Sequence, residues 1–167
     1  IPGGASAPWL YPEHLDVPLE AATVGKLGTM LGSGAVVVFD ETTDMVKACH
    51  RLVRFFARES CGKCTPCREG TSWLEKILER IIDGHGRPED LNLLLDVCDN
   101  ISVGMNWPPK QTTICPLGQS ATSPIASAIT RFQSEFEAYV GGPAEITVEV
   151  KGPAFVGPVR QEVAADA

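Results

Sequence analysis

Three cysteines in one short loop constrain this chain more than any other feature of its sequence. Cys61, Cys64 and Cys67 are spaced three residues apart, with a glycine and a proline among them. A fourth cysteine, Cys115, lies far downstream and is followed by Pro116. A tight triplet plus one remote cysteine before a proline suits a [4Fe–4S] cluster, in which each iron takes one thiolate. The spacing therefore predicts that the four sulfurs converge on one cluster.

Two other uses of these cysteines stay open on spacing alone. Structural zinc also takes four thiolates, usually from two separated Cys-x-x-Cys pairs, but no cysteine or histidine lies three residues from Cys115. The chain has six cysteines, an even number that a disulfide framework could use, yet disulfides need an oxidising compartment and no signal peptide opens the sequence. We expect iron–sulfur ligation, with a zinc-stabilised helical adaptor as the alternative.

The residues around the triplet suit an anionic group. Lys63 and Arg68 place cations inside the loop, where they favour thiolates and a negatively charged cluster. Pro66 suits the first position of a helix, with Thr65 as its N-cap. Cys67 is then expected in the first helical turn, where free N–H groups stabilise anionic sulfur.

Composition indicates one globular domain of ordinary size. The 167 residues are 44% hydrophobic, which is enough for a proper core. The net charge of -7 argues against nucleic acid as a partner. No apolar run approaches the roughly 20 residues of a membrane-spanning helix, so we expect no direct membrane span.

Hydrophobic residues recur at helical spacing in four stretches and predict a mainly α fold, a four-helix bundle. Cys49 and Cys98 lie on two of these stripes, and we interpret both as core residues rather than ligands. Trp73 lies on another stripe and is interpreted as a core aromatic. In an up-and-down bundle the loop with the triplet and the loop with Cys115 share one end. The predicted starts of the helices are Thr43, Pro66, Pro88 and Ser123 with Pro124, and Gly84 is predicted to end the second helix.

The two ends of the chain are less regular. Residues 35–39, Ala-Val-Val-Val-Phe, predict one buried strand after an irregular stretch. Because a lone strand is not stable, we expect it to pair with strands outside this chain. Residues 146–150 alternate in polarity and predict an edge strand or a disordered tail.

Three segments resemble the NADH-binding flavoprotein subunit of respiratory complex I and its relatives in NAD-linked hydrogenases and formate dehydrogenases. They are residues 59–71, 113–118 and 31–35, and the similarity covers roughly residues 1–141. The resemblance implies that Cys61, Cys64, Cys67 and Cys115 ligate one [4Fe–4S] cluster, and it implies no catalytic residue here. It also implies a role in an NADH:quinone oxidoreductase, in which single electrons pass from FMN through this cluster toward quinone.

The same resemblance implies a domain organisation and a set of partners. Residues 1–42 correspond to the end of a β-grasp-like domain, residues 43–141 to the cluster-binding bundle, and residues 142–167 to an extension or tail. The family's FMN and NADH site lies in an N-terminal domain that this sequence does not contain, so we expect a C-terminal fragment. The implied partners are that domain, a small [2Fe–2S] subunit and a large multi-cluster subunit.

The resemblance further implies a peripheral place on the cytoplasmic side of a bacterial inner membrane, or on the matrix side in mitochondria. Nothing in these residues separates complex I from a hydrogenase or formate dehydrogenase diaphorase, which is therefore the alternative host.

Exchanging the fourth ligand for serine tests the spacing argument. Cys115→Ser should lose or destabilise the cluster, whereas Cys98→Ser should leave it intact, because only the first removes a thiolate from iron. Metal analysis and EPR of both variants measure the effect. Equal cluster loss in the two variants would show that the fourth ligand is wrongly chosen.

Overall fold

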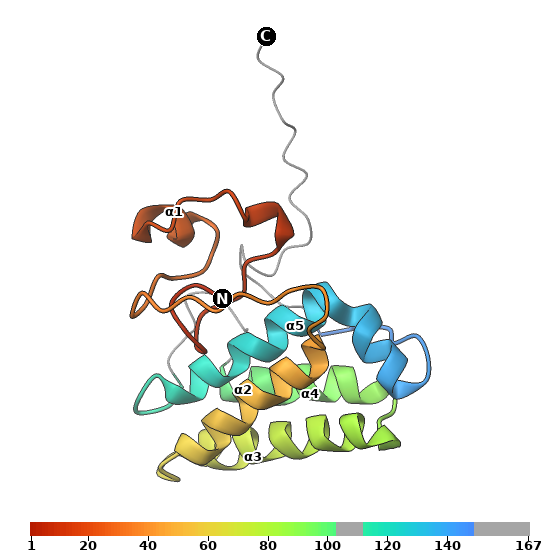
Figure 1. The fold of residues 1–167 in the computed structure, drawn as a ribbon. Coiled ribbons are helices and arrows are strands. Elements are labelled where there is room, and N and C mark those ends of the chain that lie inside the picture. The colour runs from red at the N-terminus through yellow and green to blue at the C-terminus, as the bar shows by residue number, and fades with distance from the viewer. Residues whose placement is uncertain (103–111, 149–167) are drawn as a thin grey trace.

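The computed structural model describes residues 1–102 and 112–148, and this part of the chain is mainly helical (Figure 1). No β-strand forms within these two ranges, so the mainly α prediction is confirmed. None of the helices searched there is long and apolar enough to cross a membrane. In chain order the helices are η1 (Pro12–His14), α1 (Ala21–Lys26), α2 (Met45–Glu59), α3 (Thr65–Arg80), η2 (Ile81–His85), α4 (Glu89–Ile101) and α5 (Leu117–Val140).

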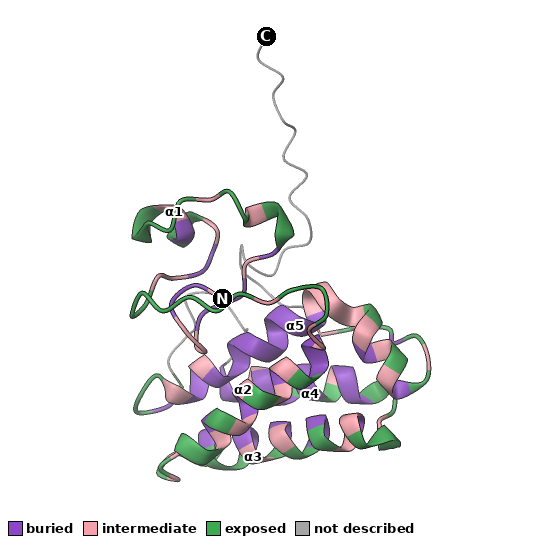
Figure 2. Ribbon diagram, in the orientation of Figure 1, coloured by how far each residue is buried: buried purple, intermediate pink, exposed green. Residues whose placement is uncertain are grey.

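Helices α2 to α5 pack around one hydrophobic core. α2 and α4 each lie against both α3 and α5. Figure 2 shows the buried residues gathered where these helices face one another. Removal of this apolar surface from water is the main force that holds the helices together. Fully buried side chains from all four helices include Val46, Leu74, Leu78, Leu91, Leu94, Ile125 and Phe136.

The first residues of α2 and α3 differ slightly from the prediction. Asp44, not Thr43, caps α2, because its Oδ1 accepts a hydrogen bond from the Lys47 N–H at 3.0 Å. Thr65 is the first residue of α3 rather than its cap, and Cys64 takes the cap position. Cys67 still falls in the first turn of α3, as predicted.

The fourth helix begins earlier than predicted. α5 starts at Leu117, and Pro124, which suggested a helix start, lies inside it. A proline inside a helix lacks a backbone donor and clashes with the preceding turn, so it usually indicates a helix start. The predicted start at Ser123 is wrong here. The helix has a non-helical residue at Phe132, where φ is -120° and ψ is 29°.

A buried carboxylate fixes the turn between α3 and α4. Asp90 is 1% exposed, and its Oδ1 lies 2.5 Å from Arg80 Nη2 at the end of α3. Its Oδ2 accepts the Arg87 N–H at 3.0 Å. Gly84, expected to stop the helix, has a φ of +79° inside η2, a conformation that glycine adopts without strain.

The predicted buried strand at residues 35–39 does not form. Val36 makes a single antiparallel bridge to Pro2, and the Val38 side chain is 80% exposed. β-branched residues favour an extended backbone, but a strand also needs neighbours, and among the described residues only residues 1–3 pair with this segment. The N-terminal segment is anchored instead through Trp9 and Tyr11, which hydrogen-bond to Ser127 of α5 at 3.1 Å each.

Two smaller expectations also change. Trp73 is 54% exposed and is not a core aromatic. Residues 146–148 form no strand. Instead, the Thr147 N–H donates to Asn92 Oδ1 at 2.8 Å and Asn92 Nδ2 donates to the Glu145 carbonyl at 2.5 Å. The rest of the predicted edge strand, residues 149–150, lies outside the described residues.

Two adjacent leucines of α4 provide a matched test of the core. Leu94 is fully buried and Leu93 is 40% exposed. Leu94→Ala should lower the free energy of unfolding by about 2–5 kcal/mol, because it leaves a cavity in the core. Leu93→Ala should cost about 1 kcal/mol or less. Urea denaturation followed by circular dichroism measures both, and equal losses would contradict the placement of α4.

Candidate metal centre

The loop between α2 and α3, residues 60–68, carries the predicted cysteine triplet at one end of the bundle. Gly62 has a φ of +76°, a left-handed conformation that lets the chain turn back toward α3. Cys61 is exposed, Cys64 is partly buried, and Cys67 is 7% exposed in the first turn of α3. The three thiols of the loop are therefore buried to different depths.

The segment that carries Cys115, residues 112–116, lies against this loop. The Ile114 N–H donates a hydrogen bond to Cys64 Sγ at 3.3 Å. Gly118 lies beside the same loop, since an added Cβ there would be in van der Waals contact with the Cβ of Cys67 at 3.4 Å. In Figure 1 the start of α5 and the loop between α2 and α3 lie at the same end of the bundle. The expectation that the two cysteine segments meet at one end is confirmed.

Polar contacts hold the Cys115 segment in shape. Thr113 Oγ1 lies 2.8 Å from the carbonyl oxygen of Cys115 and 2.6 Å from Gln119 Oε1. A threonine hydroxyl has one proton and donates to one of these two oxygens at a time, and the burial of Thr113 and Gln119 protects the hydrogen bond from water. The turn before α5 is therefore held by side chains of its own segment.

The two segments are in contact, but their sulfurs do not surround one point. Among residues 1–102 and 112–148, no three Cys, His, Asp or Glu side chains are placed to hold a metal ion together. Cys61 and Cys115 are both exposed. Exposed side chains change rotamer within nanoseconds, so the Cys61 and Cys115 thiols are not fixed in one orientation.

The surroundings of the four thiols fit a negatively charged cluster. Arg68 Nη1 donates to the Gly62 carbonyl at 2.8 Å, and Arg68 Nε pairs with Glu69 at 2.8 Å, so the guanidinium is held over the loop. The first turn of α3 adds backbone N–H groups beside Cys67. Four thiolates on a [4Fe–4S] core carry a net negative charge, which nearby cations and N–H donors stabilise.

Sequence reasoning missed three participants in this site. Ser60 Oγ lies 3.3 Å from Cys67 Sγ, the Ile114 amide contacts Cys64, and the absence of a side chain at Gly118 leaves room for Thr113. The glycine after Pro116 and Leu117 was a visible signal. The hydrogen bonds to sulfur depend on the three-dimensional position of groups that every chain contains, and no spacing rule indicates them.

The two remaining cysteines belong to the core. Cys49 and Cys98 are both 0% exposed. Burial raises the pKa of each thiol well above its usual value, and the proximity of Cys49 raises the pKa of Cys98 further. Their interpretation as small core residues is confirmed.

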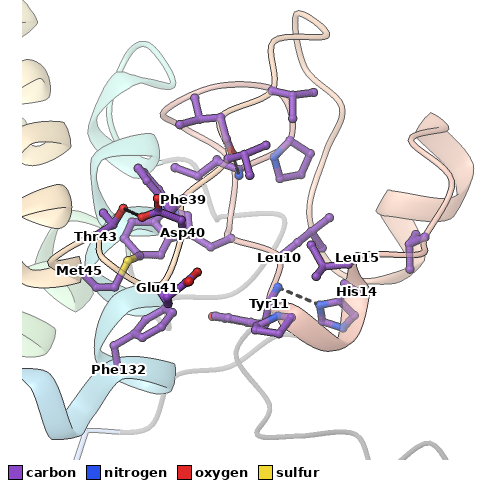
Figure 3. Close-up of a pocket in the computed structure, with 18 of the residues that line it drawn as sticks. Leu10, Tyr11, His14, Leu15, Phe39, Asp40, Glu41, Thr43, Met45 and Phe132 are labelled. Carbon is purple, nitrogen blue, oxygen red and sulfur yellow. Dashed lines mark hydrogen bonds between the residues drawn. The ribbon is translucent and has the colours of Figure 1, made fainter.

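A cavity of about 540 Å³ lies elsewhere on the molecule (Figure 3). Its lining includes Tyr11, Phe39, Met45 and Phe132. Met45 is the first residue of α2, and the cysteine loop follows the last. The cavity and the loop are therefore separated by the length of α2, which has 15 residues with a rise of about 1.5 Å each. The cavity is therefore not part of the cysteine site.

Comparison with known proteins relates the whole cysteine region to one family. The family described as the NADH-ubiquinone oxidoreductase-F iron-sulfur binding region matches residues 47–139. An NADH-quinone oxidoreductase subunit of Mycobacterium tuberculosis (strain ATCC 25618 / H37Rv) is 50% identical over 141 residues, 84% of this chain. The corresponding NADH-quinone oxidoreductase subunit of Escherichia coli (strain K12) is 39% identical over 151 residues, 90% of this chain.

A solved structure shows the same fold. A chain in the crystal structure of an NAD⁺-reducing [NiFe]-hydrogenase in the air-oxidized state superposes with a TM-score of 0.71 and 32% identity. That match covers 87% of this chain and 24% of the hydrogenase chain. The chain spans 30% of the length of the Mycobacterium tuberculosis relative and 32% of the Escherichia coli one.

Thiol alkylation separates the core cysteines from the loop cysteines. In the reduced, metal-free chain, iodoacetamide at neutral pH should modify Cys61 and Cys115. Cys49 and Cys98 should react only after unfolding, because a thiol with a raised pKa stays protonated and a buried one is inaccessible. Mass spectrometry of the labelled peptides measures this order. Native-state labelling of Cys98 as fast as that of Cys61 would contradict the core assignment.

Proposed function

This chain belongs to the NADH-ubiquinone oxidoreductase-F iron-sulfur binding region family, and we propose that it holds one [4Fe–4S] cluster. The proposed ligands are Cys61, Cys64, Cys67 and Cys115. The observation that carries this assignment is the hydrogen bond from the Ile114 N–H to Cys64 Sγ, which joins the two cysteine segments. The full burial of Cys49 and Cys98 supports leaving them out.

The proposed role is electron transfer without bond chemistry on this chain. When bound, a [4Fe–4S] cluster takes up and releases single electrons at a potential that its protein surroundings set. The residues of this chain would hold the four thiolates, tie Arg68 to the Gly62 carbonyl of their loop and exclude water from Cys67. The proposed donor is FMN reduced by NADH, and the proposed acceptors are further clusters on the way to quinone.

The names and lengths of the relatives support this role. The curated relatives are NADH-quinone oxidoreductase subunits, and about two thirds of their length lies outside the match. We assign the binding of NADH and FMN to that other part of such a protein. The proposed partners are this part, a small [2Fe–2S] subunit and a large multi-cluster subunit, in a peripheral position on the cytoplasmic or matrix side of the membrane.

The proposed domain division places residues 1–42 at the end of a β-grasp-like domain. Residues 43–141 then form the cluster-binding bundle and residues 142–167 an extension. The exposure of Val36, Val37 and Val38 supports the first boundary, because a run of valines is unusual on a solvent-facing surface. The apolar cavity beside this run is consistent with further chain packing there.

A second host is supported by a separate observation. The solved structure with a TM-score of 0.71 comes from an NAD⁺-reducing hydrogenase, so the same bundle occurs in a complex that oxidises hydrogen. The 50% identity to a subunit of NADH-quinone oxidoreductase favours the quinone-reducing host over it. Co-purification with either a membrane complex or a hydrogenase subunit distinguishes the two.

Metal content after anaerobic purification tests the proposed cofactor. We expect a brown protein with about four irons and about four sulfides per chain. A colourless protein with about one zinc would support the structural adaptor instead. Iron chelation should bleach the visible absorption, and loss of iron in Cys64→Ser with retention in Cys98→Ala would support the ligand set. Retention of all iron in Cys64→Ser would overturn it.

A further inference from the structure

Ser60 is the C-cap residue of α2, but its side chain makes contacts in the cysteine loop that capping does not explain. Its Oγ lies 3.3 Å from Cys67 Sγ, seven residues further along the chain. The same Oγ accepts the Gly62 N–H at 3.4 Å. Ser60 is therefore bound on one side by the backbone of the loop and faces a proposed ligand sulfur on the other.

The chemistry of the two groups fixes the direction of the hydrogen bond. A serine hydroxyl has one proton and two acceptor lone pairs. The Gly62 N–H donates to one lone pair of the Ser60 hydroxyl, and a thiolate that ligates iron has no proton to donate. The hydroxyl proton of Ser60 therefore points at Cys67 Sγ whenever that sulfur holds iron.

Resting on the proposed cluster, we propose that Ser60 is a positioning residue whose hydroxyl stabilises the reduced cluster through Cys67 Sγ. Reduction adds negative charge to the cluster and its sulfurs, and a hydrogen bond aimed at sulfur stabilises that charge more than it stabilises the oxidised form. The Ser60 hydroxyl thereby raises the reduction potential.

The burial of Cys67 gives this hydroxyl more weight than water would have. Cys67 is 7% exposed, whereas Cys61 and Cys115 are exposed and can be hydrated. In a poorly hydrated site a lost donor is not replaced by solvent, and a hydrogen bond there is electrostatically stronger. Cys64 receives its donor from the backbone of Ile114, which a side-chain substitution does not remove.

Redox titration of side-chain variants tests the inference. Ser60→Ala should keep its iron and shift the midpoint potential to a more negative value. The expected change is about tenfold in the reduction equilibrium, or about 59 mV for a one-electron couple. Ser60→Thr retains a hydroxyl and should stay near the wild type. Ser134→Ala, an exposed serine of α5, serves as the control. The measurement is EPR of the anaerobically purified protein at controlled potentials.

Each result has a defined meaning. An unchanged midpoint in Ser60→Ala with full iron content overturns the inference. If Ser60→Ala loses iron, Ser60→Val replaces it, because valine matches threonine in shape and lacks the hydroxyl. Iron loss in both hydroxyl-free variants also overturns the inference, since Ser60 would then hold the loop rather than set the potential. Absence of iron from the wild type would instead remove the proposed function itself.

Discussion

The hydrogen bond between the Ile114 N–H and Cys64 Sγ joins two segments that are 50 residues apart in sequence. A rigid path out and back favours such a contact, because closing a flexible loop costs conformational entropy. Helix α3 leads away from the cysteine loop and α4 returns, with Asp90 fixing the turn between them. The helical bundle is therefore the scaffold that holds the segment with Cys115 against the loop with the other three cysteines.

Close backbone approach makes this scaffold tight. An added Cβ at Gly70 of α3 would lie 2.6 Å from Ile101 of α4, and one at Gly118 would lie 2.9 Å from Thr113. A side chain at Gly70 would require the Ile101 side chain to shift, and one at Gly118 would press on Thr113 of the same segment. Protein cores are packed to near crystal density, so a shift of the core helices would also move the cysteine loop.

Local patterns anticipated much of this arrangement, and its failures have physical causes. Cysteine spacing and helical periodicity can be read from short stretches of sequence. The position of the cysteine triplet between two helices and the apolar faces of the helices could therefore be predicted. Pro124 misled because a proline signals a helix start locally, while α5 tolerates it through packing on all sides. The valines at residues 36–38 misled because hydrophobicity does not reveal whether a partner surface exists. The Ser60 contact arises only once the loop has folded.

The burial of Cys49 and Cys98 affects which disulfides the chain can form when it is oxidised. An oxidant that strips a cluster from its ligands leaves free thiols that readily form disulfides. With the two core thiols shut away from solvent, mispairing in the folded chain is restricted to the four sulfurs at the bundle end. Reduction of that small set restores the original thiols, so damage of this kind is repairable without unfolding the protein.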